Sequence, residues 1–184
     1  MDSANPQEWK ISILCVTVLL ALVFTIDSTQ KITSSNTTPP LKQEQEAIVN
    51  SSRIYLLPKE LVVKANKETT VTITIDAPEE KITGAELKIK FDPTVVKIVD
   101  ILYGDFLEKP TIFLNQVDNK EGKAIFTIGT LTPKPGKGNL AHLKILGVKE
   151  GATNISLANE TKVVALGKTG NIAQTEASSI VRVQ

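Results

Sequence analysis

Residues 84–99 read GAELKIKFDPTVVKIV, and the first half of this stretch alternates apolar with charged side chains. Successive side chains of an extended strand point to opposite faces, so a period of two separates the two kinds of side chain. We therefore expect a half-buried strand with one apolar face and one charged face. The apolar set is Ala85, Leu87, Ile89 and Phe91, and the charged set is Glu86, Lys88, Lys90 and Asp92.

A tight corner is expected directly after this strand. Asp92-Pro93 ends the strand, because proline fixes its own φ and disfavours the helical region for the residue before it. The apolar residues Val95, Val96, Ile98 and Val99 then begin a second strand. Residues 84–102 are therefore predicted to form a strand, a corner and another strand.

Four motifs in this region carry a resemblance to a known family. Gly84 leads into the alternating strand, Phe91-Asp92-Pro93 forms the corner, a valine-rich strand ends at Asp100, and Gly104-Asp105-Phe106 follows. Together they resemble the cohesin domain of cellulosomes, and the likeness runs roughly from residue 52 to 183. The resemblance implies a jelly-roll β-sandwich that binds the helices of a dockerin module and catalyses no reaction.

The rest of residues 51–184 is also typical of strands. Short apolar runs separated by turn residues every 8–12 positions predict a sandwich or barrel, and no stretch has a sustained helical period. Residues 71–75 and 84–91 are expected to be separate strands, and PKPGKGN at 133–139 a long loop. We expect an all-β domain of about nine strands in two packed antiparallel sheets, with 118–122 forming a hairpin loop.

The N-terminal part has a different composition. After a flank of residues 1–10, the run ISILCVTVLLALVFTI at 11–26 contains no charged side chain. As a helix it would span roughly 24 Å, which is between a signal-peptide core and a thin membrane anchor. Residues 27–50 are rich in Ser, Thr, Asn, Gln and Pro and are expected to be a disordered linker. The membrane segment would include Ile11, Leu14, Val18, Leu22 and Ile26.

The end of this apolar run favours an anchor, because residues 25–29 offer only a poor small-x-small cleavage site. A single-pass membrane protein is therefore expected, with cleavage and secretion as the alternative. Basic residues flank both ends, so the charges do not decide the orientation. We place the C-terminal domain outside the cell because the family resemblance implies export.

The composition argues against several classes of function. The net charge is +1 and the basic residues are scattered, so nucleic-acid binding is not expected. The domain has one histidine, His142, and no cysteine, because Cys15 lies in the apolar run. Nitrogen and sulfur metal sites and Cys-His nucleophiles are thereby excluded. We expect no cofactor and no enzymatic activity, and we interpret His142 as a solvated residue on a sheet face.

Carbohydrate binding is the first alternative to protein binding, because β-sandwich modules often stack sugars on exposed aromatic rings. Phe91 and Phe126 fall on apolar faces, whereas Tyr55, Phe106 and Phe113 lie in apolar surroundings. Only Tyr103 is expected to be exposed, so a flat sugar platform is hard to assemble. A structural surface protein is the second alternative.

The resemblance places the dockerin-binding surface on the outward residues of the strands that contain Glu86 and Ile125. Cohesins often have a carboxylate at the position of Glu86, and some have Asn where this chain has Gly84. The opposing interpretation is an ordinary solvated strand face. The hypothesis is a membrane-tethered receptor for a dockerin-bearing protein, for example one that degrades polysaccharide. Its candidate binding residues are Glu86, Lys88, Lys90, Lys123, Ile125 and Thr127.

Overall fold

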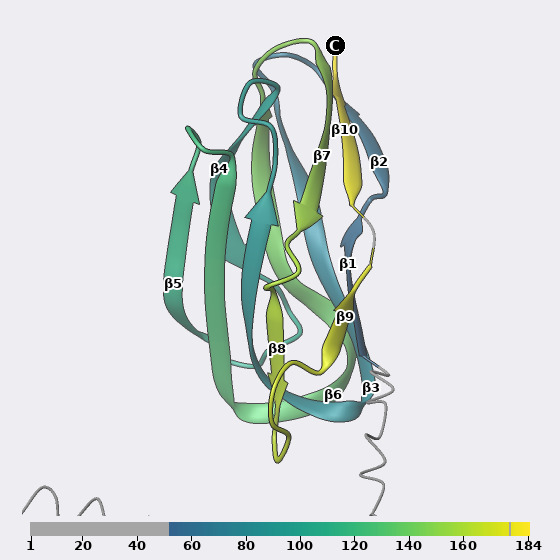
Figure 1. The fold of residues 1–184 in the computed structure, drawn as a ribbon, viewed down its shortest axis with the longest axis vertical. Helices are drawn as coiled ribbons and strands as arrows, with labels where there is room; N and C mark the ends of the chain where they lie inside the picture. Colours follow the sequence, from purple (N-terminus) through teal and green to yellow (C-terminus); the bar gives the residue numbers. More distant parts are fainter. Residues whose placement is uncertain (1–51, 177) are drawn as a thin grey trace, which may run out of the picture. The chain divides into compact units, whose positions relative to one another are not determined.

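The computed structural model describes residues 52–176 and 178–184, and every regular element within them is a β-strand. The expected flank, membrane segment and linker at residues 1–50 lie outside this part of the chain. Among the residues described, no helix is long and apolar enough to cross a membrane. The strands, shown in Figure 1, are β1 (Ser52–Leu57), β2 (Glu60–Val63), β3 (Glu68–Lys90), β4 (Val96–Tyr103), β5 (Thr111–Asp118), β6 (Lys123–Gly147), β7 (Gly151–Leu157), β8 (Lys162–Ala165), β9 (Ala173–Thr175) and β10 (Ser179–Val183).

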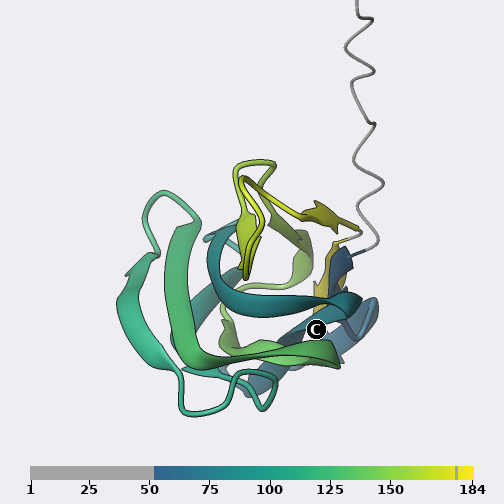
Figure 2. The same ribbon diagram turned by 90° about the horizontal axis from the view of Figure 1, so that it is seen from below.

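Two long strands, β3 and β6, organise the sheet. They pair antiparallel along most of their length, with register shifts after Ile73 and between Ala77 and Gly84. β1, β7 and β8 add to β3, whereas β4 and β5 add to β6. Hydrogen bonding therefore links the ten strands described into one sheet, and Figure 2 shows this sheet curling around a single interior.

This connectivity differs from the expected nine strands in two packed antiparallel sheets, because the ten strands described form one hydrogen-bonded sheet in which β9 pairs parallel with β1 and β2 pairs parallel with β10. The runs at 71–75 and 84–91 belong to the single strand β3. PKPGKGN at 133–139 was expected to be a loop, but it lies within β6 and pairs with β3. The prolines are tolerated because they fall where the pairing is irregular, between the Gly129 and Gly136 partners of β3.

The predicted alternation of the central strand is confirmed. Ala85, Leu87, Ile89 and Phe91 are all buried, and β6 contributes buried Phe126. Full burial of each large apolar side chain contributes about 1.5–3 kcal/mol. The second apolar run is only partly buried, because an irregularity between Ile98 and Asp100 leaves Val99 unpaired and exposed. The curled sheet is thus held by one core in which the odd-numbered residues of 85–91 are central.

Two aspartates fix the turn that follows β3 and the turn that joins β5 to β6. At the predicted corner, the Asp92 carboxylate accepts hydrogen bonds from the hydroxyl and the N–H of Thr94, at 2.7 and 2.8 Å. In the predicted hairpin loop, the Asp118 carboxylate accepts from the N–H groups of Lys120 and Glu121. These bonds lower the pKa of both carboxyl groups, for Asp92 chiefly through the Thr94 hydroxyl and for Asp118 chiefly through Glu121.

The lowered pKa values predict a loss of stability in acid. A carboxylate with a depressed native pKa stabilises the fold fully above its unfolded pKa of about 3.9, and this stabilisation is lost as the pH falls through the native pKa. Asp92→Ala and Asp118→Ala should each lower the melting temperature at pH 7, and the deficit relative to wild type should shrink toward pH 2. Glu150→Ala, which removes another exposed carboxylate, is the control. A deficit that is equal at both pH values would contradict the assignment.

Candidate functional site

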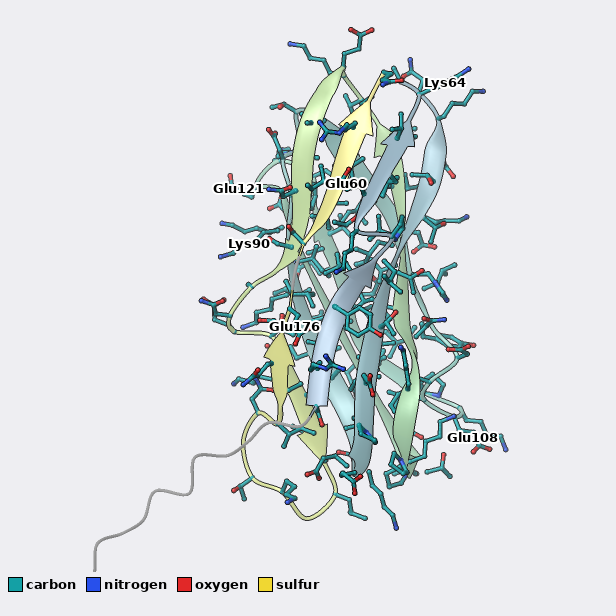
Figure 3. All side chains as sticks on the ribbon, turned by 90° about the vertical axis from the view of Figure 1, so that its right-hand side faces the viewer. Glu60, Lys64, Lys90, Glu108, Glu121 and Glu176 are labelled. Atoms are coloured by element: carbon teal, nitrogen blue, oxygen red, sulfur yellow. The ribbon has the colours of Figure 1, made fainter. Side chains whose placement is uncertain are left out.

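The six predicted site residues meet as three cross-strand pairs. In the β3–β6 register, Glu86 lies opposite Thr127, Lys88 opposite Ile125, and Lys90 opposite Lys123. Cross-strand partners share a face of the sheet, and the residues between them are the buried core residues. The six side chains therefore form one continuous outward patch. In Figure 3, Lys90 and Glu121 from the adjoining turn point outward on the same side of the ribbon.

Two further strands widen this patch. β8 pairs with the other edge of β3 and places Lys162 beside Glu86. β5 pairs with β6 and places Gln116 beside Ile125 and Asp118 beside Lys123. The outer side of β8, β3, β6 and β5, in that order, is called the four-strand face below.

Charges on the four-strand face are paired only weakly. Lys88 Nζ lies 3.1 Å from Glu86 Oε1, and Lys123 Nζ lies 3.8 Å from Glu121 Oε2. Exposed pairs of this kind are worth about 0–1 kcal/mol, so a binding partner could replace them at little cost. Lys90 makes no such pair within residues 52–176 and 178–184, although it faces Lys123 directly. Like charges opposite one another are unfavourable, so the Lys90–Lys123 end of the face carries an excess of positive charge.

The four-strand face contains two depressions. The first, called the glycine depression, has a volume of about 290 Å³; its lining includes the paired Gly84 and Gly129 together with Phe113 and Val164. The second, called the lysine depression, has a volume of about 250 Å³ and is lined chiefly by Lys88, Lys90, Lys123, Ile125, Ala158 and Glu160. An apolar hollow and a basic hollow thus lie toward opposite ends of the four-strand face.

Phe113 forms a wall of the glycine depression, and this exposed position of Phe113 was not predicted from the sequence. A register shift between Ile112 and Leu114 leaves Phe113 unpaired, and its side chain is 69% exposed rather than set in apolar surroundings. A Cβ on Gly129 would lie only 2.9 Å from the Phe113 ring, so the glycine lets the ring lie against the backbone. Its flanking apolar residues are typical of a core strand, but Ile112 and Leu114 are also exposed, at 43% and 41%, so this part of β5 lies at the surface on both sides of the bulge.

The loop between β7 and β8 is fixed to the edge of the face by a buried threonine. The Thr161 hydroxyl accepts from the Lys88 N–H at 3.1 Å and donates to the Lys88 carbonyl at 3.3 Å. Ala158 N–H also donates to that carbonyl, at 2.7 Å. This bonding holds Glu160 and Lys162 beside the face, and it depends on long-range pairing that the local sequence does not reveal.

Side chains suited to catalysis do not gather on the four-strand face. His142 lies on the other half of β6, half-buried, with Nδ1 3.1 Å from the Thr72 hydroxyl. The part of the chain that the structure describes contains no group of three or more His, Cys, Asp or Glu residues able to hold a metal. Tyr103 is exposed as predicted, but it is on β4 and Phe113 is on β5.

Comparison with known proteins identifies one family. The cohesin-domain profile matches residues 57–182. A comparison with curated proteins finds no match.

Solved structures share the fold. A non-cellulosomal cohesin from the hyperthermophilic archaeon Archaeoglobus fulgidus is 15% identical, with a TM-score of 0.61 over 72% of this chain and 91% of that chain. A type II cohesin domain from the cellulosome of Acetivibrio cellulolyticus is 16% identical, with a TM-score of 0.61 over 71% and 94%. The sixth cohesin of scaffoldin B from the same organism, solved in complex with a mutant Cel5 dockerin, is 11% identical, with a TM-score of 0.59 over 72% and 99%.

The two glycines of the glycine depression should respond differently to added side chains. A Cβ on Gly84 would lie 2.7 Å from the Ile128 carbonyl oxygen, which is fixed in the strand. A Cβ on Gly129 would lie 2.9 Å from the Phe113 ring, which can swing away, and 3.2 Å from the Thr83 carbonyl oxygen, which is a milder clash. Gly84→Ala should cost about 1–3 kcal/mol in the free energy of unfolding, and Gly129→Ala less than half as much, measured by urea denaturation. Equal losses would mean that the Phe113 ring is not free to move.

Proposed function

Because the chain belongs to the cohesin domain family, we propose that residues 52–184 bind a dockerin module through the four-strand face. Cohesin domains are binding modules without catalytic activity, so this chain is not an enzyme. The cohesin of scaffoldin B was solved with a dockerin bound, which supports a dockerin-bearing partner for this chain. The likeness also supports describing the curled sheet as a two-layered jelly-roll sandwich.

The observation that carries this proposal is the meeting of all six predicted residues in three cross-strand pairs on one face. Ile125 is a partly buried apolar side chain between Lys88 and Gln116, its partners on the neighbouring strands. An apolar centre with a polar rim is the usual anatomy of a protein interface, and residues near the centre tend to dominate the binding energy. Ile125 would act as this central anchor.

Glu86 would supply the directional contact. Its carboxylate is only partly exposed and lies 3.1 Å from the Lys88 ammonium group, in a weak pair that a partner could replace. A docking helix that donates an N–H or hydroxyl to Glu86 would form a charge-assisted hydrogen bond, worth more than a neutral one. Thr127, directly opposite Glu86, could donate or accept beside it.

We further propose that the apolar run at residues 11–26 is a membrane anchor that holds this domain outside the cell. The absence of charge throughout this run and the polar residues 27–50 that follow support an anchor with a spacer. The receptor would then retain a dockerin-bearing protein, such as a polysaccharide-degrading enzyme, at the cell surface. Carbonate-washed membranes of the native host should keep the chain with residue 11 still present. Recovery from the medium with an N-terminus after residue 26 would establish the secreted alternative.

Direct carbohydrate binding is the second candidate, and the exposed Phe113 ring is the observation that favours it. A single ring at the wall of the glycine depression is a small platform compared with a row of aromatic side chains. We therefore place carbohydrate binding below dockerin binding and test both together.

The test measures capture of the detergent-solubilised full chain by immobilised dockerin modules from its own genome and by insoluble polysaccharides. We expect retention by at least one dockerin, and Glu86→Ala combined with Ile125→Ala should weaken it about 30- to 100-fold, as for the loss of a central anchor. The melting temperature should change by only a few degrees, because Glu86 is exposed and Ile125 only partly buried.

The matched control is Leu102→Ala with Lys144→Ala, an apolar and a charged exposed residue on β4 and the other half of β6. This control should leave capture unchanged. Retention on a polysaccharide without any dockerin retention would overturn the proposal in favour of carbohydrate binding. Equal weakening by both double variants would show that the four-strand face is not the binding surface.

A further inference from the structure

We propose that the four-strand face recognises two features of one docking helix, a bulky apolar side chain in the glycine depression and a carboxylate in the lysine depression. This inference rests on the proposed function for the identity of the partner and adds the chemistry by which that partner is selected. It is carried by residues that lie outside the predicted set as well as within it.

The glycine depression is built for an apolar side chain. Gly84 and Gly129 are cross-strand partners on the outward side of the sheet, and because neither has a side chain the surface is hollowed there although both residues are buried. Phe113, which is 69% exposed, and Val164, which is 42% exposed, present apolar surface to the hollow. Apolar surface of this kind gains about 25 cal/mol per Å² when a partner removes it from water. An isobutyl or phenyl group from a helix would fill the hollow and cover the exposed parts of Phe113 and Val164.

The lysine depression has the opposite character. Lys88, Lys90 and Lys123 line it, and Glu160 is the one carboxylate among its lining residues. Lys88 already contacts Glu86, and Lys123 has a weak, largely exposed pair with Glu121 at 3.8 Å, whereas Lys90 faces Lys123 as a like charge. A carboxylate from the partner would lie between two ammonium groups and remove this repulsion. Charge complementarity therefore selects an acidic side chain at this end.

The distance between the two depressions sets the spacing on the partner. Lys90 lies six residues after Gly84 on β3, which at about 3.3 Å per residue is roughly 20 Å. An α-helix that runs along the strands covers this distance in about 13 residues at 1.5 Å per residue. The positions nearest this separation that share a helix face with position i are i+11 and i+14. The partner is thus a helix of three to four turns with an apolar residue at one end and Asp or Glu at the other.

A displayed helix library tests this rule without knowledge of the natural partner. A stable single-helix scaffold is randomised along one face, at positions i, i+3, i+7, i+11 and i+14, and selected for binding to the solubilised full chain. Enriched clones should carry Leu, Ile, Met, Phe or Trp at one end of this face and Asp or Glu at the other. Selected clones without an apolar residue at one end of the face and an acidic residue at the other would overturn the inference.

Variants of the face assign each feature to its depression. The binding affinity of the selected helices should fall at least about 10-fold in the Phe113→Ala variant. It should fall by a similar factor in the double variant Lys90→Gln with Lys123→Gln. Tyr103→Ala on β4, an exposed aromatic with 52% exposure, is the matched control and should have no effect. Because these side chains are exposed, circular dichroism melts of all three variants should match wild type. Helices that bind Phe113→Ala as tightly as wild type would contradict the apolar subsite.

The same variants on the dockerin array separate this inference from the proposed function. A dockerin captured equally by wild type and Phe113→Ala would refute the two-point rule while leaving dockerin binding intact. Selected helices that obey the rule, together with no captured dockerin, would refute the proposed partner while retaining the two subsites.

Discussion

The register between β3 and β6 is the constraint on which both the core and the candidate site depend. Leu87 lies opposite Phe126 inside the sheet, and the next pair, Lys88 and Ile125, lies outside. A shift of one residue in a strand would move every side chain to the other face, which would bury lysines and expose the core. Burial of the apolar set therefore fixes the outward set as well, so the fold and the candidate binding surface follow from one pairing.

The four-strand face is consequently presented by strands rather than by loops. Its edges are held by Thr161 bonded to the backbone of Lys88 and by β5 paired with β6. A surface fixed in this way loses little conformational entropy on binding, which favours affinity at a modest contact area. The face also changes along its length, from an apolar hollow over Gly84 and Gly129 beside Phe113 to the opposed Lys90 and Lys123. Because the two ends of the face differ in this way, a bound helix would have a preferred direction along the strands.

Local sequence was sufficient for those features that depend on alternation. The strand over 84–91, its corner at Asp92 and the outward pairing of six candidate residues follow from a period of two and from the family resemblance. The continuity of β3 and β6 could not be predicted, because glycine and proline at 133–139 are typical of loops and only pairing with β3 keeps them extended. The exposure of Phe113 follows from the surface position of β5, nearly all of which is exposed, and the approach of Lys162 to Glu86 follows from the pairing of β8 with β3. Such features are set by tertiary contacts.

The central claim is that even-numbered residues of 85–90 form a binding surface while odd-numbered ones fill the core. A cysteine scan of these positions tests it directly, with Cys15, the chain's single cysteine, replaced by serine. Thiol labelling of the native protein should be fast at 86, 88 and 90 and slow at 85, 87 and 89. Addition of a captured dockerin should slow labelling at the even positions alone. Fast labelling at odd positions, or even positions that the bound dockerin leaves unprotected, would contradict the account.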